Sequence, residues 1–323
     1  MKIGNTFFNL NLENRNFIKS NIEKTYRLIK ILNYFNSDSF FKDKFALKGG
    51  TAINLTQVPL LRLSVDIDLD LTKTLNKEET NLLKEEFENK FTKYITLNNY
   101  TLPKSIKKTY ALLSFQLYYV NAWGNKDSIK VEINFLDRAH ILPLENRQPL
   151  INFGEPNLNI LTLNTTELYA SKINALTGRA APRDLYDVNM MIEKIIIEDT
   201  KMLKKCLIFY NMVGGKQDID DIDFTKIEAI NYNMVKRQLK PVLDKKDKFN
   251  LDKAKEKVIN YLKALIKLDD DEIKFIKEFR QHNYDPSLLF KDDEIIKNII
   301  NHPMALWRCK NNIIRTETID NIE

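Results

Sequence analysis

The chain has 323 residues, of which 43% are hydrophobic and 29% charged, values that are ordinary for a folded globular protein and exclude general disorder. Its 50 Lys and Arg against 44 Asp and Glu give a net charge of +6, which permits a phosphate-bearing partner without requiring one. No apolar run approaches the roughly 18 residues of a membrane span, no signal peptide is expected, and two cysteines cannot form a disulfide framework.

Predicted helices and strands alternate through the first half of the chain. Helical spacing of apolar residues predicts a helix over 16–35, and strict alternation predicts a strand over 65–71. The Trp123–Asp127 turn predicts that two neighbouring strands form a hairpin. The full set is helix 16–35, strand 45–47, helix 52–57, strand 65–71, helix 77–95, strands 109–120 and 128–136, and strand 159–163.

From about residue 165 the pattern becomes helical. The predicted helices cover 165–177, 183–197, 200–213, 224–239, 252–267, 269–281 and 292–301. The sequence therefore predicts an α+β protein. A small mixed sheet with flanking helices occupies 1–164, and a helical domain occupies 165–323.

The strand predicted over 65–71 carries three acids on one face. Side chains alternate along a strand, so Asp66, Asp68 and Asp70 lie opposite the apolar residues between them. Like charges about 6.6 Å apart at Cα repel each other unless solvent or a divalent cation neutralises them. A magnesium site is one interpretation, and a solvated face of an edge strand is the other.

The strand predicted over 128–136 offers a further acid. Lys130, Glu132 and Asn134 alternate with apolar residues and share its polar face. If both strands belong to one sheet with their polar faces on the same side, Glu132 lies near Asp66 and Asp68. Two aspartates on one strand and an acid on another are typical of a hard-metal site for phosphoryl chemistry. A half-exposed hairpin with surface charges is the alternative.

Two glycines, Gly49 and Gly50, separate an apolar run from a predicted helix. Glycine permits close backbone approach and positive φ without steric cost, and N–H groups at a helix start bind phosphate. Thr51 adds a hydroxyl and Lys48 a positive charge. The segment suits a phosphate group, although an ordinary tight turn gives the same dipeptide and the spacing of a P-loop is missing.

Lys172 lies on the predicted helix 165–177, on a side otherwise made of small and apolar residues. Its ammonium either reaches solvent or points into a phosphate pocket. Arg179, Arg183 and Asp184 follow around the start of the next helix. In the functional interpretation an arginine binds phosphate and Asp184 accepts a proton; in the structural one they form a helix cap and an ion pair.

Taken together, these segments resemble the AbiEii/AbiGii nucleotidyltransferase toxin family of the minimal nucleotidyltransferase-like superfamily. The resemblance covers about residues 45–307 and is carried by Leu47–Ala52, Arg62–Leu69, Lys130–Ile133, Glu167–Lys172, Arg183–Asp187, Asp285–Phe290 and His302–Trp307. It implies a nucleotidyltransferase core and Mg²⁺-dependent transfer of NMP from an NTP. It also implies a toxin of a toxin–antitoxin or phage-defence system; some relatives add nucleotides to the tRNA acceptor end.

The resemblance also assigns roles to residues. Asp66, Asp68 and Glu132 would hold one or two Mg²⁺ ions, and Lys172 and Asp184 would complete the catalytic set. The residues expected to contact the nucleotide are Lys48, Gly49, Gly50, Thr51, Ser64, Lys172, Arg179 and Arg183. Two departures stand out: Gly-Gly-Thr replaces the usual Gly-Ser, and the extra acid Asp70 leaves open which carboxylates bind metal.

The expected partners are the NTP, an RNA acceptor such as tRNA, and a cognate antitoxin encoded nearby, in the cytoplasm and away from membranes. Lys104, Lys107, Lys108 and the Lys-rich region 240–263 could follow acceptor phosphates, although solvated surfaces give the same pattern. Two other functions stay open at this point. One is nucleotidyl transfer to a small molecule such as an aminoglycoside, and the other is NTP binding without turnover.

Overall fold

The structure is a computed structural model that describes residues 16–58, 62–195 and 197–310. The chain divides into two compact units. The first comprises Met1–Arg138, Leu144–Leu163 and Leu239–Lys248, and the second comprises Ala139–Pro143, Asn164–Gln238 and Phe249–Glu323. Two short segments, 139–143 and 239–248, therefore cross the single division expected at residue 164.

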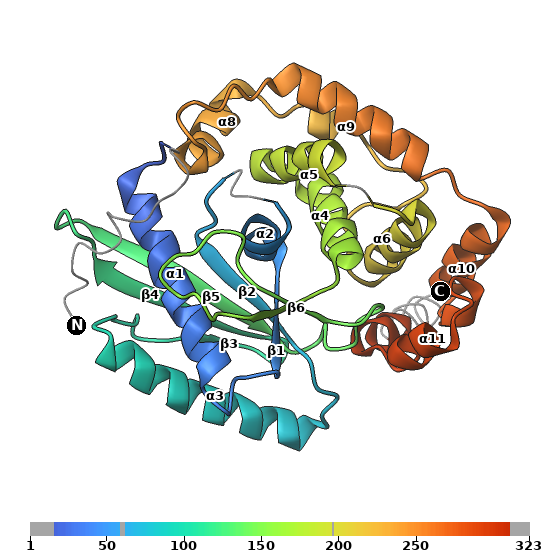
Figure 1. Cartoon of the computed structure of the whole chain (residues 1–323). Helices are drawn as coiled ribbons and strands as arrows, with labels where there is room; N and C mark the ends of the chain where they lie inside the picture. The colour runs from blue at the N-terminus through green and yellow to red at the C-terminus, as the bar shows by residue number, and fades with distance from the viewer. Residues whose placement is uncertain (1–15, 59–61, 196, 311–323) are drawn as a thin grey trace, which may run out of the picture. The chain divides into compact units, whose positions relative to one another are not determined.

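A seven-stranded mixed sheet organises the described part of the first unit, in the order β3-β4-β5-β2-β1-β7-β6 (Figure 1). Its strands are β1 (Phe45–Lys48), β2 (Asp66–Leu71), β3 (Lys107–Lys108), β4 (Leu112–Val120), β5 (Lys126–Asn134), β6 (Glu145–Arg147) and β7 (Ile160–Thr162). The pairs β2–β5 and β1–β7 are parallel, and the other neighbours are antiparallel. The predicted mixed sheet is confirmed, with two short strands added, because β3 and β6 are too short to show alternation.

One face of this sheet is apolar and is covered by α1 (Lys19–Ser37) and α3 (Lys77–Leu97). Aromatic rings fill the layer: Phe35 of α1 lies 5.8 Å from Phe87 of α3, and Phe91 of α3 lies 5.0 Å from Phe115 of β4. The helix α3 begins at a capping box formed by Asn76 and Glu79, which satisfies two backbone N–H groups. The acids of β2 point to the opposite, polar face.

The segment 239–248 joins the first unit through backbone contacts. Leu63 donates its N–H to the carbonyl of Val242 at 2.8 Å, and the side-chain amide of Asn21 donates to the carbonyl of Pro241 at 2.6 Å. The 3₁₀ helix η3 (Lys240–Val242) supplies donors for the carbonyls of Leu239 and Lys240, whereas those of Pro241 and Val242 accept these external donors.

Helices make up the described part of the second unit, as predicted. They are α4 (Thr165–Arg179), α5 (Pro182–Lys194), α6 (Thr200–Gly214), α7 (Thr225–Glu228), α8 (Tyr232–Gln238), α9 (Leu251–Leu265), α10 (Asp270–Arg280), η4 (Pro286–Leu288) and α11 (Asp293–Ile299). None of the helices in the described ranges has the length and apolarity needed to cross a membrane.

The single helix predicted over 224–239 is wrong, because the structure divides it into α7 and α8. The side chain of Asn231 accepts a hydrogen bond from the backbone N–H of Met234 at 3.1 Å. An asparagine side chain that bonds to the backbone ahead of it competes with helix continuation and starts a new helix instead.

Glu167 fastens the segment Ala139–Pro143 to the second unit. Its fully buried carboxylate accepts the backbone N–H groups of Ile141 and Leu142 at 2.9 and 3.0 Å, and the hydroxyl of Tyr210 at 2.5 Å. The three hydrogen bonds to this buried carboxylate offset the free-energy cost of removing it from water.

Glu167→Ala is expected to destabilise the protein by about 3 kcal/mol, because the buried N–H of Ile141 and two part-buried donors, on Leu142 and Tyr210, lose their acceptor. Denaturant unfolding measures the loss. Tyr210→Phe is the matched control, since it removes a single donor and should cost about 1 kcal/mol. Equal losses in the two variants would show that the carboxylate does not hold the 139–143 segment.

Candidate functional site

The register of β2 and β5 places the predicted acids on one face of the sheet. Asp68 is the direct partner of Glu132, and Asp66 is the partner of Lys130. Paired residues of neighbouring strands point to the same side, and neighbouring strands lie about 4.8 Å apart. Asp66, Asp68 and Glu132 therefore share the polar face, and all three are half-buried. Oxygen ligands at these positions can be drawn together by one divalent ion.

Glu132 forms a salt bridge with a neighbouring lysine in the structure. Its carboxylate lies 2.6 Å from the ammonium of Lys130, two residues earlier on the same face of β5. In the part of the chain that the structure describes, no three His, Cys, Asp or Glu side chains are grouped closely enough to hold a metal ion. For a metal ion to bind all three acids, Glu132 would have to release Lys130 and bind the ion instead.

Asp70 stands apart from the other acids of β2. It is only 1% exposed, and its carboxylate lies 2.5 Å from the ammonium of Lys48. Burial raises the pKa of Asp70 to about 8, and the charge of Lys48 opposes that rise. Lys48 also contacts Asp137 at 3.3 Å, and Asn134 donates to the same Asp137 carboxylate at 2.8 Å. Asp70 therefore holds Lys48 in place. Lys48 is one of the residues expected from the sequence to contact the nucleotide.

The glycine turn lies directly against the acids. Gly49 has φ +69°, and a Cβ atom added there would lie 2.9 Å from Oδ2 of Asp68. Both facts favour glycine at this position, because other residues are strained at this φ and a side chain would displace the carboxylate. Gly50 and Thr51 follow within the short helix α2 (Gly49–Ala52), which continues as a π-helix over Ile53–Gln57.

The hydroxyl groups of Thr51 and Ser64 are used inside the protein. Thr51 donates to the carbonyl of Asp66, and its oxygen lies 2.7 Å from the hydroxyl of Ser64. Both residues are buried. These bonds tie the glycine turn to the start of β2, so the two hydroxyls position Asp66 in this structure.

Gly49→Ala is expected to lower nucleotidyl transfer by about tenfold to a hundredfold, since displacing a group by about 1 Å has effects of that size. The turn would also lose about 1–2 kcal/mol of stability from left-handed strain. Gly124→Ala is the matched control: it has φ +81° and nothing within 4 Å of the added Cβ. Parallel transfer assays and melting curves separate the two effects. Equal activity in both variants would exclude a role of the Gly49–Asp68 contact.

A buried ion cluster occupies the second unit around Lys172. The ammonium of Lys172 lies 3.0 Å from Asp184 and 3.0 Å from Asp187, and all three side chains are at most 6% exposed. Arg179 donates to both carboxylate oxygens of Asp184, at 2.6 Å from Nε and 2.9 Å from Nη2. The helices α4 and α5 supply the four residues, with Pro182 in the first turn of α5. The aspartates thus hold the ammonium of Lys172 and the guanidinium of Arg179 in fixed positions.

Asp184 is a poor proton acceptor in this setting. Burial raises its pKa, but Lys172 and Arg179 outweigh burial and hold the pKa of the carboxyl below its ordinary value. Its oxygens already accept three charged donors. Arg183, the other predicted phosphate ligand, donates instead to the carbonyl of Gln238 at 2.6 Å.

The lowered pKa of Asp184 predicts how stability depends on pH. The folded-state pKa lies below the ordinary 3.8, so the stabilisation is complete above that value and is lost as the pH falls below it. Asp184→Asn should therefore flatten the acid limb of the unfolding free energy by up to about 1.36 kcal/mol per pH unit. Denaturant titrations between pH 5 and pH 2 measure the slope; an unchanged slope would contradict the ionised pair.

Two members of these clusters, Asp137 and Asp187, were not predicted as site residues. Asp187 had a visible signal, because it follows Asp184 at i, i+3 on the same helix face. Asp137 had none, since it follows β5 in a loop and meets Lys48 only through the tertiary fold.

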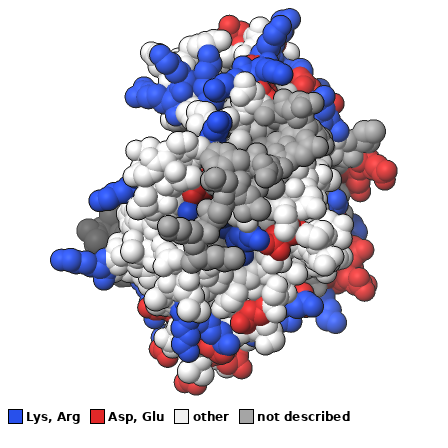
Figure 2. Space-filling view, turned by 60° about the vertical axis from the view of Figure 1, so that its left-hand side comes forward, with Lys and Arg blue, Asp and Glu red and all other residues white. Residues whose placement is uncertain are grey.

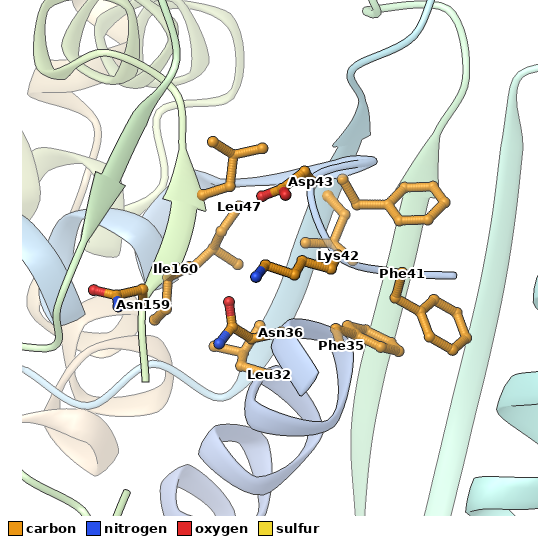
Figure 3. Close-up of a pocket in the computed structure, with 12 residues that line it drawn as sticks. Leu32, Phe35, Asn36, Phe41, Lys42, Asp43, Leu47, Asn159 and Ile160 are labelled. Carbon is orange, nitrogen blue, oxygen red and sulfur yellow. The ribbon is translucent and has the colours of Figure 1, made fainter. Parts of the chain in front are cut away.

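The cavity of Figure 3 is separate from this site. Its volume is about 30 Å³, and it is lined by residues of α1, β1, β2 and β7 that include Leu32, Leu47, Leu69 and Ile160. Leu47 and Leu69 alternate with Lys48 and Asp68 along their strands and so face the α1 side of the sheet. Polar side chains, among them Asn36, Lys42, Asp43 and Asn159, also line this small cavity.

On the face shown in Figure 2, lysine and arginine side chains form several separate groups, some of them beside acidic side chains. The described residues on this face do not form one continuous basic surface.

Comparison with known proteins agrees with the geometry. The model of the family described as "Nucleotidyl transferase AbiEii toxin, Type IV TA system" matches residues 30–279. Among solved structures, the chain is similar to MenT4, the nucleotidyltransferase toxin Rv2826c from Mycobacterium tuberculosis H37Rv. The TM-score is 0.59 at 15% identity, covering 90% of this chain and 95% of that chain. This likeness shows a shared fold.

No curated protein matches the sequence. Because the family match spans most of the sequence, the chain belongs to the AbiEii family of nucleotidyltransferase toxins of type IV toxin–antitoxin systems.

Proposed function

We propose that this nucleotidyltransferase transfers NMP from an NTP to RNA in a Mg²⁺-dependent reaction, with tRNA as the first acceptor to test. The observation that carries the proposal is the register of β2 and β5, which puts Asp66, Asp68 and Glu132 on one face of the sheet. An apolar core gains nothing from three acids on one face, whereas a divalent ion neutralises them.

The donor set fits Mg²⁺. Asp66, Asp68 and Glu132 supply carboxylate oxygens, the ligands that a hard cation prefers, and all three are partly accessible. Bound there, Mg²⁺ would polarise the α-phosphate and neutralise charge on the leaving pyrophosphate. Lys130 would keep Glu132 paired until the ion arrives.

The remaining residues act as positioning groups. Gly49 would let the turn approach Asp68 closely, because it carries no Cβ that would displace that carboxylate. Within the second unit, Asp184 holds the charged groups of Lys172 and Arg179 in place, and the family resemblance makes these two side chains the proposed phosphate contacts. The acceptor hydroxyl oxygen bonds to the α-phosphorus, the bond from that phosphorus to the oxygen bridging to the β-phosphate breaks, pyrophosphate leaves, and the hydroxyl proton passes to solvent. Such transfer depends mainly on positioning and charge stabilisation.

Membership of a type IV toxin family also supports a cognate antitoxin that counteracts this activity. We place the reaction in the cytoplasm, where RNA and NTPs occur. Cys206 and Cys309 are both free thiols, which is consistent with a reducing compartment.

Incubation with total tRNA, Mg²⁺ and each of the α-labelled NTPs in turn tests the proposal. We expect label in tRNA from one or more NTPs, with equal release of pyrophosphate and no reaction in EDTA. Label in an aminoglycoside but in no RNA would assign a small-molecule acceptor. NTP binding without pyrophosphate release from any acceptor would overturn the transferase proposal.

A further inference from the structure

The polar face of the sheet continues outward from the acids onto β4. In the register of β5 and β4, Glu132 pairs with Ser114, Lys130 with Gln116, Ser128 with Tyr118 and Lys126 with Val120. These residues all point to the side that carries Asp66 and Asp68. The residues between them, such as Phe115 and Leu117, are fully buried on the other side.

The outer end of this face exposes aromatic surface. Tyr118 is 44% exposed and Val120 is 61% exposed, and Trp123 at the tip of the β4–β5 turn is 43% exposed. Closer to the acids the face is polar, since Gln116 donates to the hydroxyl of Ser128 at 2.7 Å. The aromatic ring of Tyr118 therefore lies on a polar surface of the sheet. The core of a protein–protein interface would instead be a broad apolar patch.

Lysines lie on the same side of the sheet as Tyr118. Lys126 and Lys130 belong to β5, and Lys107 of β3 pairs with Ser114 and so shares the face. Lys107 and Lys126 are exposed. Lys108 points to the other side, where its ammonium lies 3.0 Å from Glu88 of α3. Alternation along β3 therefore puts one lysine on each side of the sheet.

We propose that this surface, the β4–β5 face (Lys107, Tyr118, Val120, Lys126 and Lys130), docks the acceptor, and that the docked part is a single-stranded end of a nucleic acid. The inference rests on the proposed function, which it deepens by giving the acceptor a place. Exposed aromatic rings stack on bases, and lysines beside them meet the phosphates. These are the features that single-stranded nucleic acid requires, and the negative backbone complements the lysines.

The geometry also fits the reaction. Tyr118 is opposite Ser128, four residues along β5 from Glu132, a distance of about 13 Å at about 3.3 Å per residue. A base stacked on Tyr118 would therefore belong to a nucleotide a few positions from the reacting end, since stacked nucleotides rise about 3.4 Å each. The terminal hydroxyl would then lie over Asp66, Asp68 and Glu132.

Substitutions at Tyr118 test the stacking. Tyr118→Leu should raise the KM for tRNA and the Kd for a fluorescent single-stranded RNA oligonucleotide by roughly tenfold, as expected from loss of one base stack. Tyr118→Phe keeps the ring and should behave like the wild type. The KM for NTP should not change in either variant. Equal RNA binding by the wild type and Tyr118→Leu would overturn the inference.

Lys107 and Lys108 provide a matched pair of charge reversals. Lys107→Glu should weaken oligonucleotide binding severalfold and reduce its salt dependence, because a phosphate contact is lost. Lys108→Glu makes the same charge change on the other side of β3 and should leave binding as in the wild type. Equal weakening in both variants would indicate a general charge effect and contradict docking on this face.

The two assays separate this inference from the proposed function. If the wild type labels tRNA while Tyr118→Leu and Lys107→Glu use it equally well, RNA transfer stands and the docking surface is wrong. If the wild type labels no RNA, the proposed acceptor is wrong, and the oligonucleotide binding assay still decides the surface. Failure of the wild type to bind the oligonucleotide would overturn the surface directly.

Discussion

Asp66→Asn and Asp68→Asn are each expected to lower nucleotide transfer by at least about a thousandfold while leaving the melting temperature nearly unchanged. An amide oxygen in place of a carboxylate removes a negative charge from the proposed Mg²⁺ site. Metal stabilisation of the transition state is worth several kcal/mol, and each 1.36 kcal/mol is a tenfold change in rate. Both side chains are half-buried on the polar face of the sheet, outside its apolar layer, so we expect the substitutions to disturb the fold little.

The matched control is Glu145→Gln on the edge strand β6, which makes the same loss of charge in the same sheet. Label transfer and pyrophosphate release report activity, and thermal unfolding reports the fold. If either aspartate variant keeps transfer within tenfold of the wild type, the acid face is not the metal site. Raising Mg²⁺ should restore part of the lost activity only if metal affinity is the defect.

Lys172→Met is expected to destabilise the protein by about 3–5 kcal/mol, the usual cost of removing one partner of a buried ion pair. The substitution leaves Asp187, which is 3% exposed, without the ammonium that lies 3.0 Å from it. Asp184 retains the guanidinium of Arg179. Transfer should fall as well, because the proposed phosphate contact is lost.

Denaturant unfolding of Lys172→Met and of the double variant Lys172→Met, Asp187→Leu measures this effect. Removing both charges should recover much of the lost stability, because the buried carboxylate that loses its ammonium is then removed as well. Activity should stay low in the double variant. Full activity with recovered stability would show that Lys172 has only a structural role.

The faces of individual strands were predictable from the sequence, but their pairing was not. Alternation places Asp66, Asp68 and Asp70 on one side of β2 and Glu132 on one side of β5. Whether β5 lies beside β2, and in which register, depends on long-range contacts that leave no local signal. The structure supplies that step by pairing Asp68 with Glu132 in a parallel ladder.

The sequence also could not separate acids that look alike along the strand. Asp70 has the same alternation as Asp68, but the fold brings Lys48 to 2.5 Å from it and buries it. Thr51 and Ser64 likewise resemble free hydroxyl groups in the sequence, whereas in the structure they bond to each other and to the start of β2. Burial and partners of this kind arise only when the strands are packed.

The central claim is that Asp66, Asp68 and Glu132 hold a divalent ion beside the NTP. A crystal structure of the full chain grown with Mn²⁺ and a non-hydrolysable NTP analogue tests it most directly. We expect an anomalous peak within about 2.3 Å of oxygens from these three side chains and from the triphosphate. A triphosphate bound elsewhere, or Glu132 still paired with Lys130 and no manganese on the acid face, would contradict the claim.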